Sequence, residues 1–379
     1  MEFLLQGLTA TTWQQLVMYV IGAILIYLAI SKKLEPALLL PMGFGAILVN
    51  IPFSGALHTT MPGIGEVAGI LEWLFEVGIE ASEAMPLLLF IGIGAMIDFG
   101  PLLSNPKLVL FGAAAQFGIF ATISVAALLG FPLKDAASIG IIGAADGPTS
   151  ILVSQVLKSQ YVGAIAVAAY SYMALVPIIQ PFAIKLVTTK KERAIRMPYN
   201  PKSVSRMARL LFPIIVTMIA GYVAPASVSL VGLLMFGNLI RESGVLGSLS
   251  ETAQNVLANL ITLLLGITIA ASMQADKFVR PETMLIMLLG LLAFVFDTIA
   301  GVLFAKLMNL FSRQKVNPMV GAAGISAFPM SARVVQRMGQ EADSQNHLLM
   351  HAVGANVAGQ IASVIAGGVI LGLVPGMLA

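Results

Sequence analysis

The feature that most constrains this chain is a series of apolar stretches, each close to the length that a helix needs to cross a bilayer. A membrane-spanning helix requires about 20 predominantly apolar residues. Hydrophobic residues make up 58% of the 379 positions and charged residues only 10%, whereas soluble domains carry about a quarter charged residues. The sequence therefore predicts an all-α polytopic protein embedded in a lipid bilayer, without a nucleic-acid partner.

Ten spans are expected, in two sets of five. The first set covers about 14–31, 36–50, 84–99, 107–130 and 160–186, and the second about 208–224, 226–240, 255–273, 281–310 and 346–375. Between the fourth and fifth span of each set lies a stretch rich in Gly, Ser, Thr and Pro, at 134–158 and at 317–340. Because Gly and Pro interrupt helices, each stretch predicts two half-helices, as a re-entrant hairpin or a broken span.

Basic residues gather in one loop. Seven Lys and Arg residues lie within 190–209, directly after the fifth span. Since Lys and Arg accumulate in cytoplasmic loops, this loop is predicted to be cytoplasmic and both termini to lie outside. The chain then divides into a first repeat at 1–189, the basic loop and a second repeat at 210–379. The acidic stretch 51–83, before the third span, predicts an amphipathic helix at the membrane interface.

Short segments of similar sequence occur in the two halves of the chain. Phe44-Gly45 in the second span resembles Phe236-Gly237 in the seventh, and the Gly-Ala-Ala at Gly143 resembles the one at Gly321. Five spans per half is an odd number, so the halves must run in opposite directions across the membrane. This pattern predicts two inverted-topology repeats of the elevator-transporter kind, with the binding site where the two hairpins meet.

Asp146 lies inside the first hairpin, in Gly143-Ala-Ala-Asp-Gly-Pro-Thr-Ser150. A carboxylate within the hydrocarbon region is costly and normally faces a cavity or a partner. Irregular backbone at this depth is tolerated only where it lines a cavity or is buried in protein. Carboxylate, hydroxyl and carbonyl oxygens are ligands for a hard cation, so the stretch predicts an ion site.

Further polar positions lie in the second hairpin and in the span after each hairpin. Asn317 and Ser326 offer oxygens and Gly321 allows close backbone approach, although Asn317 could equally be a helix cap. Asn356 and Tyr172 lie at similar positions in the two following spans. An asparagine in a membrane helix can also join helices, and a tyrosine can simply bury its ring.

Arg333 and Asp297 each allow two interpretations. Arg333 and Arg337 share one helix face; they either snorkel towards the cytoplasmic surface, or Arg333 attracts an anionic substrate from that side. Asp297 lies deep in its span and either adds charge to a cation pathway or pairs with the neighbouring Thr298. The chain has no cysteine, which excludes disulfides, thiolate metal sites and thiol catalysis.

Three segments together resemble a known family. Asp146-Gly-Pro-Thr-Ser, Asn317-Pro…Gly321…Ser326…Arg333 and His347…His351…Asn356-Val-Ala-Gly are similar to the β-subunit of sodium-pumping biotin-dependent decarboxylases, which act on oxaloacetate, methylmalonyl-CoA or glutaconyl-CoA. The resemblance covers nearly the whole chain.

The resemblance implies a translocase of the bacterial or archaeal plasma membrane that decarboxylates carboxybiotin, consumes a proton and exports Na⁺. It implies that Asp146, Asn317 and Asn356 bind Na⁺, and that Tyr172, Gly321, Ser326 and Arg333 support binding or coupling, with Arg333 contacting carboxybiotin. It also implies a carboxyltransferase and biotin-carrier subunit, a small membrane subunit and a homo-oligomer. The chain has no Ala-Met-Lys-Met-like biotinylation site, so a partner must carry the biotin.

The inverted repeat alone would allow a second function, a sodium-coupled solute transporter of the elevator type. Fold does not settle function. A pump of this kind needs a soluble partner docked on the basic face, whereas a solute transporter needs only a solute cavity. The acid or acyl-CoA that the complex decarboxylates is chosen by another subunit, so this chain does not reveal it.

Overall fold

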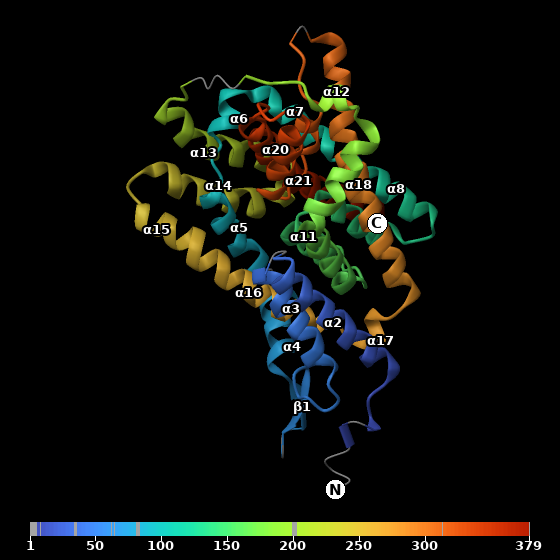
Figure 1. The fold of residues 1–379 in the computed structure, drawn as a ribbon. Coiled ribbons are helices and arrows are strands. Elements are labelled where there is room, and N and C mark those ends of the chain that lie inside the picture. Colours follow the sequence, from blue (N-terminus) through green and yellow to red (C-terminus); the bar gives the residue numbers. More distant parts are fainter. Residues whose placement is uncertain are drawn as a thin grey trace.

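The computed structural model describes residues 6–7, 9–33, 36–61, 63, 65–80, 84–198, 203–312 and 314–378. This part of the chain is almost entirely helical (Figure 1). Its first half contains α2 (Trp13–Ser31), α3 (Pro36–Asn50), α4 (Ile70–Phe75), η1 (Glu76–Glu80), α5 (Ala84–Met96), α6 (Gly100–Ser104), η2 (Pro106–Leu108), α7 (Val109–Ala115), α8 (Phe117–Leu128), α9 (Leu133–Gly140), η3 (Ile141–Ala144), α10 (Gly147–Val156), α11 (Val162–Val187) and α12 (Lys190–Arg193).

The second half is also built from helices. It consists of α13 (Arg206–Val223), η4 (Pro225–Ser227), α14 (Val228–Ser243), α15 (Gly247–Glu251), η5 (Thr252–Leu257), α16 (Ala258–Ile269), η6 (Ala270–Ser272), α17 (Ala275–Phe278), α18 (Pro281–Phe311), α19 (Met319–Ala322), α20 (Met330–Ala342) and α21 (Leu349–Leu378). Each of the ten expected spans coincides with a helix or a run of consecutive helices.

Six of these helical runs are long and apolar enough to cross a membrane, and two further bent pairs qualify if each pair is one span. The six are Trp13–Ser31, Pro106–Leu128, Arg206–Val223, Gly247–Ser272, Pro281–Phe311 and Leu349–Met377. The helix Pro36–Asn50 is apolar but shorter. A polytopic membrane protein is therefore confirmed.

The outermost spans expose apolar surface. Only 11% of the most apolar window of α13 and 22% of that of α2 is buried within the chain, compared with 67% for α21. Exposed side chains on α13 include Met218, Ile219 and Tyr222. Contiguous apolar surface of this kind is rare on soluble proteins, so lipid or another subunit must cover these helices, whereas α21 lies in the centre of the fold (Figure 1).

The bend in α11 has a proline as its cause. The helix changes direction by 71° between Met173 and Leu175, and Pro177 follows within the next turn. Proline removes a backbone donor and clashes with the carbonyl four residues before it, which is Met173. Because of this bend, the first part of α11 and its second part face different neighbours.

The stretch 51–83 differs in part from the expectation. A helix is present at 70–80, formed by α4 and η1, but it follows a two-stranded antiparallel hairpin of β1 (His58–Met61) and β2 (Gly65–Ala68). Gly63 and Gly65 have positive φ values of 80° and 101°, a conformation that glycine adopts without a steric penalty. The all-α prediction is therefore wrong at this hairpin. Its strands are only four residues long, which is too short for an alternation of polar and apolar residues to indicate a strand.

Contacts divide the helices into two groups. In one group α3 packs against α2 and α16, and α5 against α14 and α16. In the other, α18 packs against α8, α11 and α19, while α21 packs against α7, α10 and α20. In Figure 1 the first group includes the lower, blue helices near β1 and the second surrounds α21. Both glycine-rich hairpins belong to the second group.

Both hairpins are broken helices, as expected. In the first, α9 and η3 end at Ala144 and α10 begins at Gly147. Pro148 therefore lies in the first turn of α10, where its missing N–H costs nothing. In the second, α19 ends at Ala322 and α20 begins at Met330. Two stretches of non-helical backbone are thus buried in the centre of the chain.

Candidate ion site

The candidate site lies at the break in the first hairpin. Ala145 adopts a left-handed conformation with φ 52°, and Asp146 that follows is extended and caps the N-terminus of α10. Asp146 is 4% exposed. The break therefore turns a carboxylate inward at the point where two helix ends leave backbone groups without partners from their own helix.

Four donors converge on the Asp146 carboxylate. The hydroxyl of Thr149 donates to Oδ2 at 2.7 Å, and the Thr149 backbone N–H faces Oδ1 at 3.5 Å. From α21, Gln360 Nε2 and Ser363 Oγ each donate to Oδ2 at 3.3 Å. Among the described residues, no Lys, Arg or His forms an ion pair with Asp146. The carboxylate is thus held by neutral donors and has no countercharge within this part of the chain.

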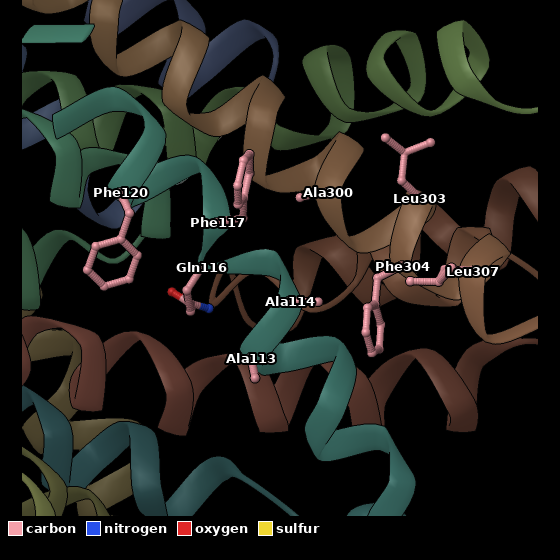
Figure 2. A pocket seen from close by; sticks show the side chains of 9 residues that line it. All are labelled: Ala113, Ala114, Gln116, Phe117, Phe120, Ala300, Leu303, Phe304 and Leu307. Carbon is pink, nitrogen blue, oxygen red and sulfur yellow. The ribbon is translucent and has the colours of Figure 1, made fainter. Parts of the chain in front are cut away.

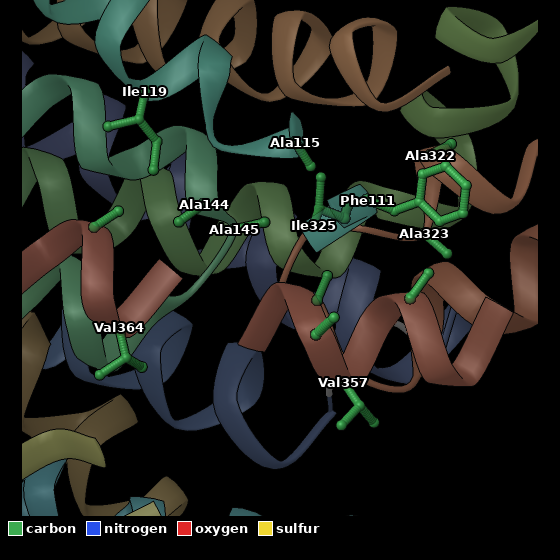
Figure 3. Packing of buried hydrophobic residues seen from close by; sticks show 14 of the residues in the cluster. Phe111, Ala115, Ile119, Ala144, Ala145, Ala322, Ala323, Ile325, Val357 and Val364 are labelled. Carbon is green, nitrogen blue, oxygen red and sulfur yellow. The ribbon is translucent and has the colours of Figure 1, made fainter. Parts of the chain in front are cut away.

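The tip of the second hairpin touches the first directly. The backbone N–H of Ser326 donates to the carbonyl of Ala144 at 3.1 Å, and its hydroxyl donates to the same oxygen at 2.5 Å. Asn356 Nδ2 donates to the carbonyl of Ile325 at 2.6 Å. Figure 3 shows Ala144 and Ala145 beside Ile325, with α21 and its labelled Val357 below them. Helix α21 therefore joins both hairpin tips.

Two buried oxygen atoms at this junction have no hydrogen-bond partner in the described part of the chain. They are Asn356 Oδ1 and the hydroxyl of Tyr170. The Tyr170 ring lies against Gly147, where a methyl group would come within 2.2 Å of it. Buried polar atoms are nearly always satisfied, so these two oxygens are available to a bound cation or to water.

A cavity of about 240 Å³ opens beside the carboxylate. Asp146, Tyr170, Ser326 and Gln360 line it on the side of the hairpins. Helices α3, α5 and α16 supply the opposite wall, through residues that include Leu38, Ile93 and Asn259. The carboxylate therefore faces the boundary between the two groups of helices, with space for a hydrated ion.

The residues expected at the site lie in different surroundings. Asp146, Ser326 and Asn356 lie together. Tyr172 lies elsewhere: its hydroxyl donates to the carbonyl of Met287, and its ring packs near Gly290 of α18. Gly321 packs against α18 so closely that a methyl group there would lie 2.0 Å from the Gly301 carbonyl oxygen.

The other two expected residues point away from Asp146. The Asn317 amide donates to the carbonyls of Arg193 and Ile195 at 2.8 and 2.9 Å, and its Oδ1 caps the N–H of Met319 at 3.0 Å. These bonds fit the helix-cap interpretation and attach the second hairpin to the basic loop. Arg333 is exposed on α20 and lines neither the Asp146 cavity nor the groove of Figure 2.

Sequence reasoning missed three residues around Asp146. Gln360 and Ser363 follow Asn356 at four and seven residues, which is one face of a helix, so this spacing could have revealed them. Tyr170 lies two residues before the tyrosine that was expected, and the sequence gives no reason to prefer it. Both tyrosines precede the bend of α11. Because residues two apart lie about 200° apart around a helix, Tyr170 faces Gly147 and Tyr172 faces Gly290 of α18.

Asp297 is a second buried carboxylate near the first hairpin. A methyl group on Gly143 would come within 2.7 Å of its Oδ2. The backbone N–H groups of Gly118 and Ile119 face its carboxyl group, yet neither oxygen accepts a hydrogen bond of ordinary geometry from the described residues. The hydroxyl of Thr298 is also without a partner there, so the expectation that it pairs with Asp297 is wrong.

A wider groove lies between α7, α8 and α18 (Figure 2). Phe117, Phe120, Leu303 and Leu307 line it, and Gln116 is its polar lining side chain. The Gln116 amide donates to the carbonyl of Gly112 on its own helix at 2.9 Å. The groove is thus an apolar surface feature without the converging oxygens found at Asp146.

Almost the whole chain is similar to a known protein family. The sequence model of the family described as "Na⁺-transporting oxaloacetate decarboxylase beta subunit" matches residues 14–374. The chain is 47% identical to the oxaloacetate decarboxylase beta chain of Klebsiella pneumoniae, over 94% of each chain. It is 48% identical to the methylmalonyl-CoA decarboxylase subunit beta of Propionigenium modestum, again over 94% of each.

A third relative has yet another substrate in its name. The chain is 48% identical to the glutaconyl-CoA decarboxylase subunit beta of Acidaminococcus fermentans, over 98% of this chain and 96% of the relative. Full-length similarity to proteins of three such complexes agrees with the resemblance carried by the two hairpins and α21. The chain therefore belongs to the Na⁺-transporting oxaloacetate decarboxylase beta-subunit family.

Proposed function

We propose that this chain is the membrane subunit of a sodium pump that decarboxylates carboxybiotin presented by a partner subunit. In this reaction the bond between the ureido nitrogen of biotin and the carboxyl carbon breaks. The electron pair stays on the nitrogen, which takes up one proton, and CO₂ leaves. Free energy released in this step drives Na⁺ outward if carboxybiotin and Na⁺ favour one conformation over another.

The observation that carries this proposal is the Asp146 carboxylate, which is buried at a cavity and has no cationic side-chain partner among the described residues. A sodium ion is the missing countercharge. Asp146 would bind it, with Asn356 Oδ1 and the Tyr170 hydroxyl as further oxygens, because both are buried and uncommitted. After Na⁺ leaves, the same carboxylate would accept the proton that the reaction consumes.

The other candidate residues have proposed roles that follow their contacts. Ser326 would couple ion binding to the position of the second hairpin, because its hydroxyl donates to the carbonyl of Ala144, two residues before Asp146. Gly321 and Asn317 would hold that hairpin against α18 and the basic loop. Tyr172 would fix α11 against α18. Arg333, exposed and charged, would attract the carboxybiotin anion towards the second hairpin.

An inverted-repeat architecture is part of this proposal, and paired contacts support it. Ser150 Oγ lies 3.4 Å from the Ile141 carbonyl in the first hairpin, and Ser331 Oγ lies 3.4 Å from the Ala322 carbonyl in the second. The offsets agree, since 331 − 150 = 181 and 322 − 141 = 181. These contacts favour an offset of 181 rather than the 178 that the Gly-Ala-Ala echo predicts.

The glycines of the hairpins support the same offset. Gly140 packs against the Ile119 carbonyl of α8, and Gly321, at 321 − 140 = 181, packs against the Gly301 carbonyl of α18. Contacts between whole helices show the same correspondence. If α14 is the counterpart of α3 and α16 the counterpart of α5, then the contact of α3 with α16 in the structure corresponds to the contact of α14 with α5. The two groups of helices would then act as a stationary scaffold and a moving transport core.

Sidedness and partners complete the proposal. The 190–209 loop would face the cytoplasm and both termini the outside; residues 199–202 of this loop lie outside the described part. A carboxyltransferase subunit with its biotin carrier would dock on the basic face, with a small membrane subunit and further copies of this chain covering exposed apolar helices. The membrane would be the bacterial or archaeal plasma membrane. Family membership favours this pump over a solute transporter.

The test is purification of the chain from its native membrane under mild detergent. We expect a biotinylated protein to co-purify, seen with streptavidin, and the preparation to decarboxylate carboxybiotin faster when Na⁺ is added. After reconstitution into vesicles, ²²Na⁺ should accumulate only while carboxybiotin is consumed. Sodium-driven uptake of a solute by the chain alone, without a biotinylated partner, would instead establish the transporter.

A further inference from the structure

A second cavity, of about 780 Å³, lies on the side of the molecule that carries the basic loop. Its walls come from four segments that are far apart in sequence: α6 to α7, the loop residues 195–198, the end of α18 from Met308 with the residues after it to 316 except residue 313, and the start of α21. Cavities of roughly 300–1,000 Å³ are typical of sites for small organic molecules, and this cavity lies within that range.

The cavity has positive charge and no negative lining group in the described part of the chain. Lys107, Arg196 and Lys315 line it, whereas no Asp or Glu does. Arg196 is committed to Asp343, with Nε–Oδ2 at 2.5 Å and a second bond at 2.9 Å. Lys107 forms no ion pair or hydrogen bond with the described residues, and Lys315 donates only to the Asn309 carbonyl. Two ammonium groups are therefore available to an anion.

The remaining wall is apolar and adaptable. Met197, Met308 and Met350 line the cavity, and Phe111 lies among them. Methionine side chains are flexible and polarisable, and they pack well against rings and sulfur atoms. A ligand of this cavity therefore needs an anionic end for the lysines and a compact apolar ring for the thioethers.

The cavity is built by the same residues that attach the second hairpin. Asn317 and Asn346 both donate to the carbonyls of Arg193 and Ile195, which hold the loop over the cavity. On the inner side, the carbonyl of Phe111 contacts the tip of the second hairpin, since a methyl group on Gly324 would come within 2.4 Å of it. Figure 3 shows Phe111 beside Ala322 and Ala323.

We propose that this cavity between Lys107, Lys315 and Met350 receives the carboxylated ureido ring of carboxybiotin, with the N-carboxylate at the two lysines and the bicyclic ring against the methionines. This inference rests on the proposed function, because it locates the organic substrate of the same reaction. The fit follows from the chemistry: carboxybiotin combines one carboxylate with a compact thioether-containing ring, and its tether must leave through an open, exposed rim such as that formed by Lys107, Lys315 and Met350.

This placement gives a physical connection to the ion site. Phe111 at the inner wall touches Gly324, and the next residues of the hairpin tip, Ile325 and Ser326, are bonded to Asn356 and Ala144. Ala144 is two residues from Asp146. A ring that presses on Phe111 can therefore change the position of the tip of the second hairpin. Coupling between two sites requires an element with two arrangements that contacts both sites, and this hairpin tip contacts both.

The test uses the assembled complex with its biotin-carrying partner and free N-carboxybiotin as substrate at saturating Na⁺. Lys107→Gln and Lys315→Gln should each raise KM for carboxybiotin by at least about fivefold, since a charge-assisted contact contributes roughly 1 kcal/mol or more. The double variant should show a larger rise, with kcat changed by less than about twofold. The matched control is Lys185→Gln, which removes an exposed charge near the end of α11, outside the basic loop, and does not line the cavity.

Two further measurements separate binding from folding and from the ion site. Sodium protection against heat should be the same in the lysine variants and in the wild type. Met350→Trp fills the rim of the cavity without changing its charge and should raise KM for carboxybiotin in the same assay. A photoreactive biotin derivative should label peptides that contain Met197, Met308 or Met350 in the wild type and less in the double lysine variant.

The outcomes distinguish this inference from the function on which it rests. If the wild-type complex fails to decarboxylate carboxybiotin in response to Na⁺, the proposed function is wrong. If the wild type is active but the double lysine variant keeps the KM of the Lys185→Gln control, the cavity is not the site. Photolabelling near Arg333 on α20 instead of the methionines would overturn the placement in the same way.

Discussion

Replacing Asp146 with asparagine is the most direct test of the ion site. Asparagine keeps the shape of the side chain and is as good a helix N-cap as aspartate. Its amide oxygen can still accept the Thr149 hydroxyl, which now lies 2.7 Å from Oδ2, while the bonds from Gln360 and Ser363 are long at 3.3 Å. We therefore expect the free energy of unfolding to change by less than about 1 kcal/mol.

The effect on sodium should be far larger. A unit charge about 4 Å from another, at an effective dielectric constant of about 20, contributes roughly 4 kcal/mol. Asp146 is 4% exposed and has no cationic side-chain partner among the described residues, so little solvent screening reduces this figure. Loss of about 4 kcal/mol corresponds to about a thousandfold weaker binding, which would abolish sodium-stimulated decarboxylation and transport at ordinary salt concentrations.

The assay is the sodium concentration that gives half-maximal decarboxylation, together with sodium protection against heat. Asp135→Asn is the matched control: Asp135 is also buried in the first hairpin and accepts a hydrogen bond from Ser159 at 2.6 Å, but it does not line the cavity. The control should keep the wild-type sodium dependence. If the sodium concentration for half-maximal activity of Asp146→Asn lies within about threefold of the wild-type value, the carboxylate is not an ion ligand.

Three further predictions concern the surroundings of the site. Asn356→Ala should raise the sodium concentration for half activation by about tenfold, the effect of losing one neutral oxygen ligand worth roughly 1.4 kcal/mol; unchanged half activation would remove it from the site. The hydrogen bonds from Arg196 hold the pKa of Asp343 below its usual value. The stabilisation that this exposed pair gives the 194–198 segment is therefore present above about pH 4 and is lost as pH drops through that lowered pKa. Asp343→Asn should raise the rate of proteolysis in this segment at pH 7 only a few-fold, because Asn317 and Asn346 also bind its carbonyls. Arg333→Gln should impair decarboxylation more than sodium protection, because it removes the positive charge that attracts the carboxybiotin anion, while Arg333→Lys, which keeps that charge, should be tolerated.

The positions of the spans could be predicted because burial in lipid demands long apolar helices. The break at Asp146 could also be predicted, since Gly147 and Pro148 interrupt a helix wherever the rest of the chain lies. The sequence does not show on which side of the Gly-Pro pair the helix ends; capping by Asp146 and the left-handed Ala145 decide that.

Which polar residues meet at the carboxylate depends on tertiary contacts that a single sequence does not specify. Tyr170 and Tyr172 lie on opposite sides of the straight first part of α11, so the packing of this helix decides that Tyr170 reaches Gly147 and Tyr172 reaches α18. For Asn317 the sequence leaves a helix cap and an oxygen ligand open, and the family resemblance implies the ligand. The loop carbonyls that accept its bonds are more than 100 positions earlier in the chain, so the sequence does not reveal them. The β1–β2 hairpin was missed because four-residue strands carry almost no periodic signal.

Contacts at the hairpin tips explain how one small ion could control a large assembly. Under the proposed function, sodium at Asp146 would draw in the uncommitted oxygen of Asn356, whose amide already holds the Ile325 carbonyl. Ser326, next in sequence, is fixed to Ala144 by two bonds to one oxygen. The two broken helices therefore cannot separate without breaking bonds that an occupied site would strengthen. Release of sodium would weaken that junction, so the conformation of the hairpins and the occupancy of the site would change together.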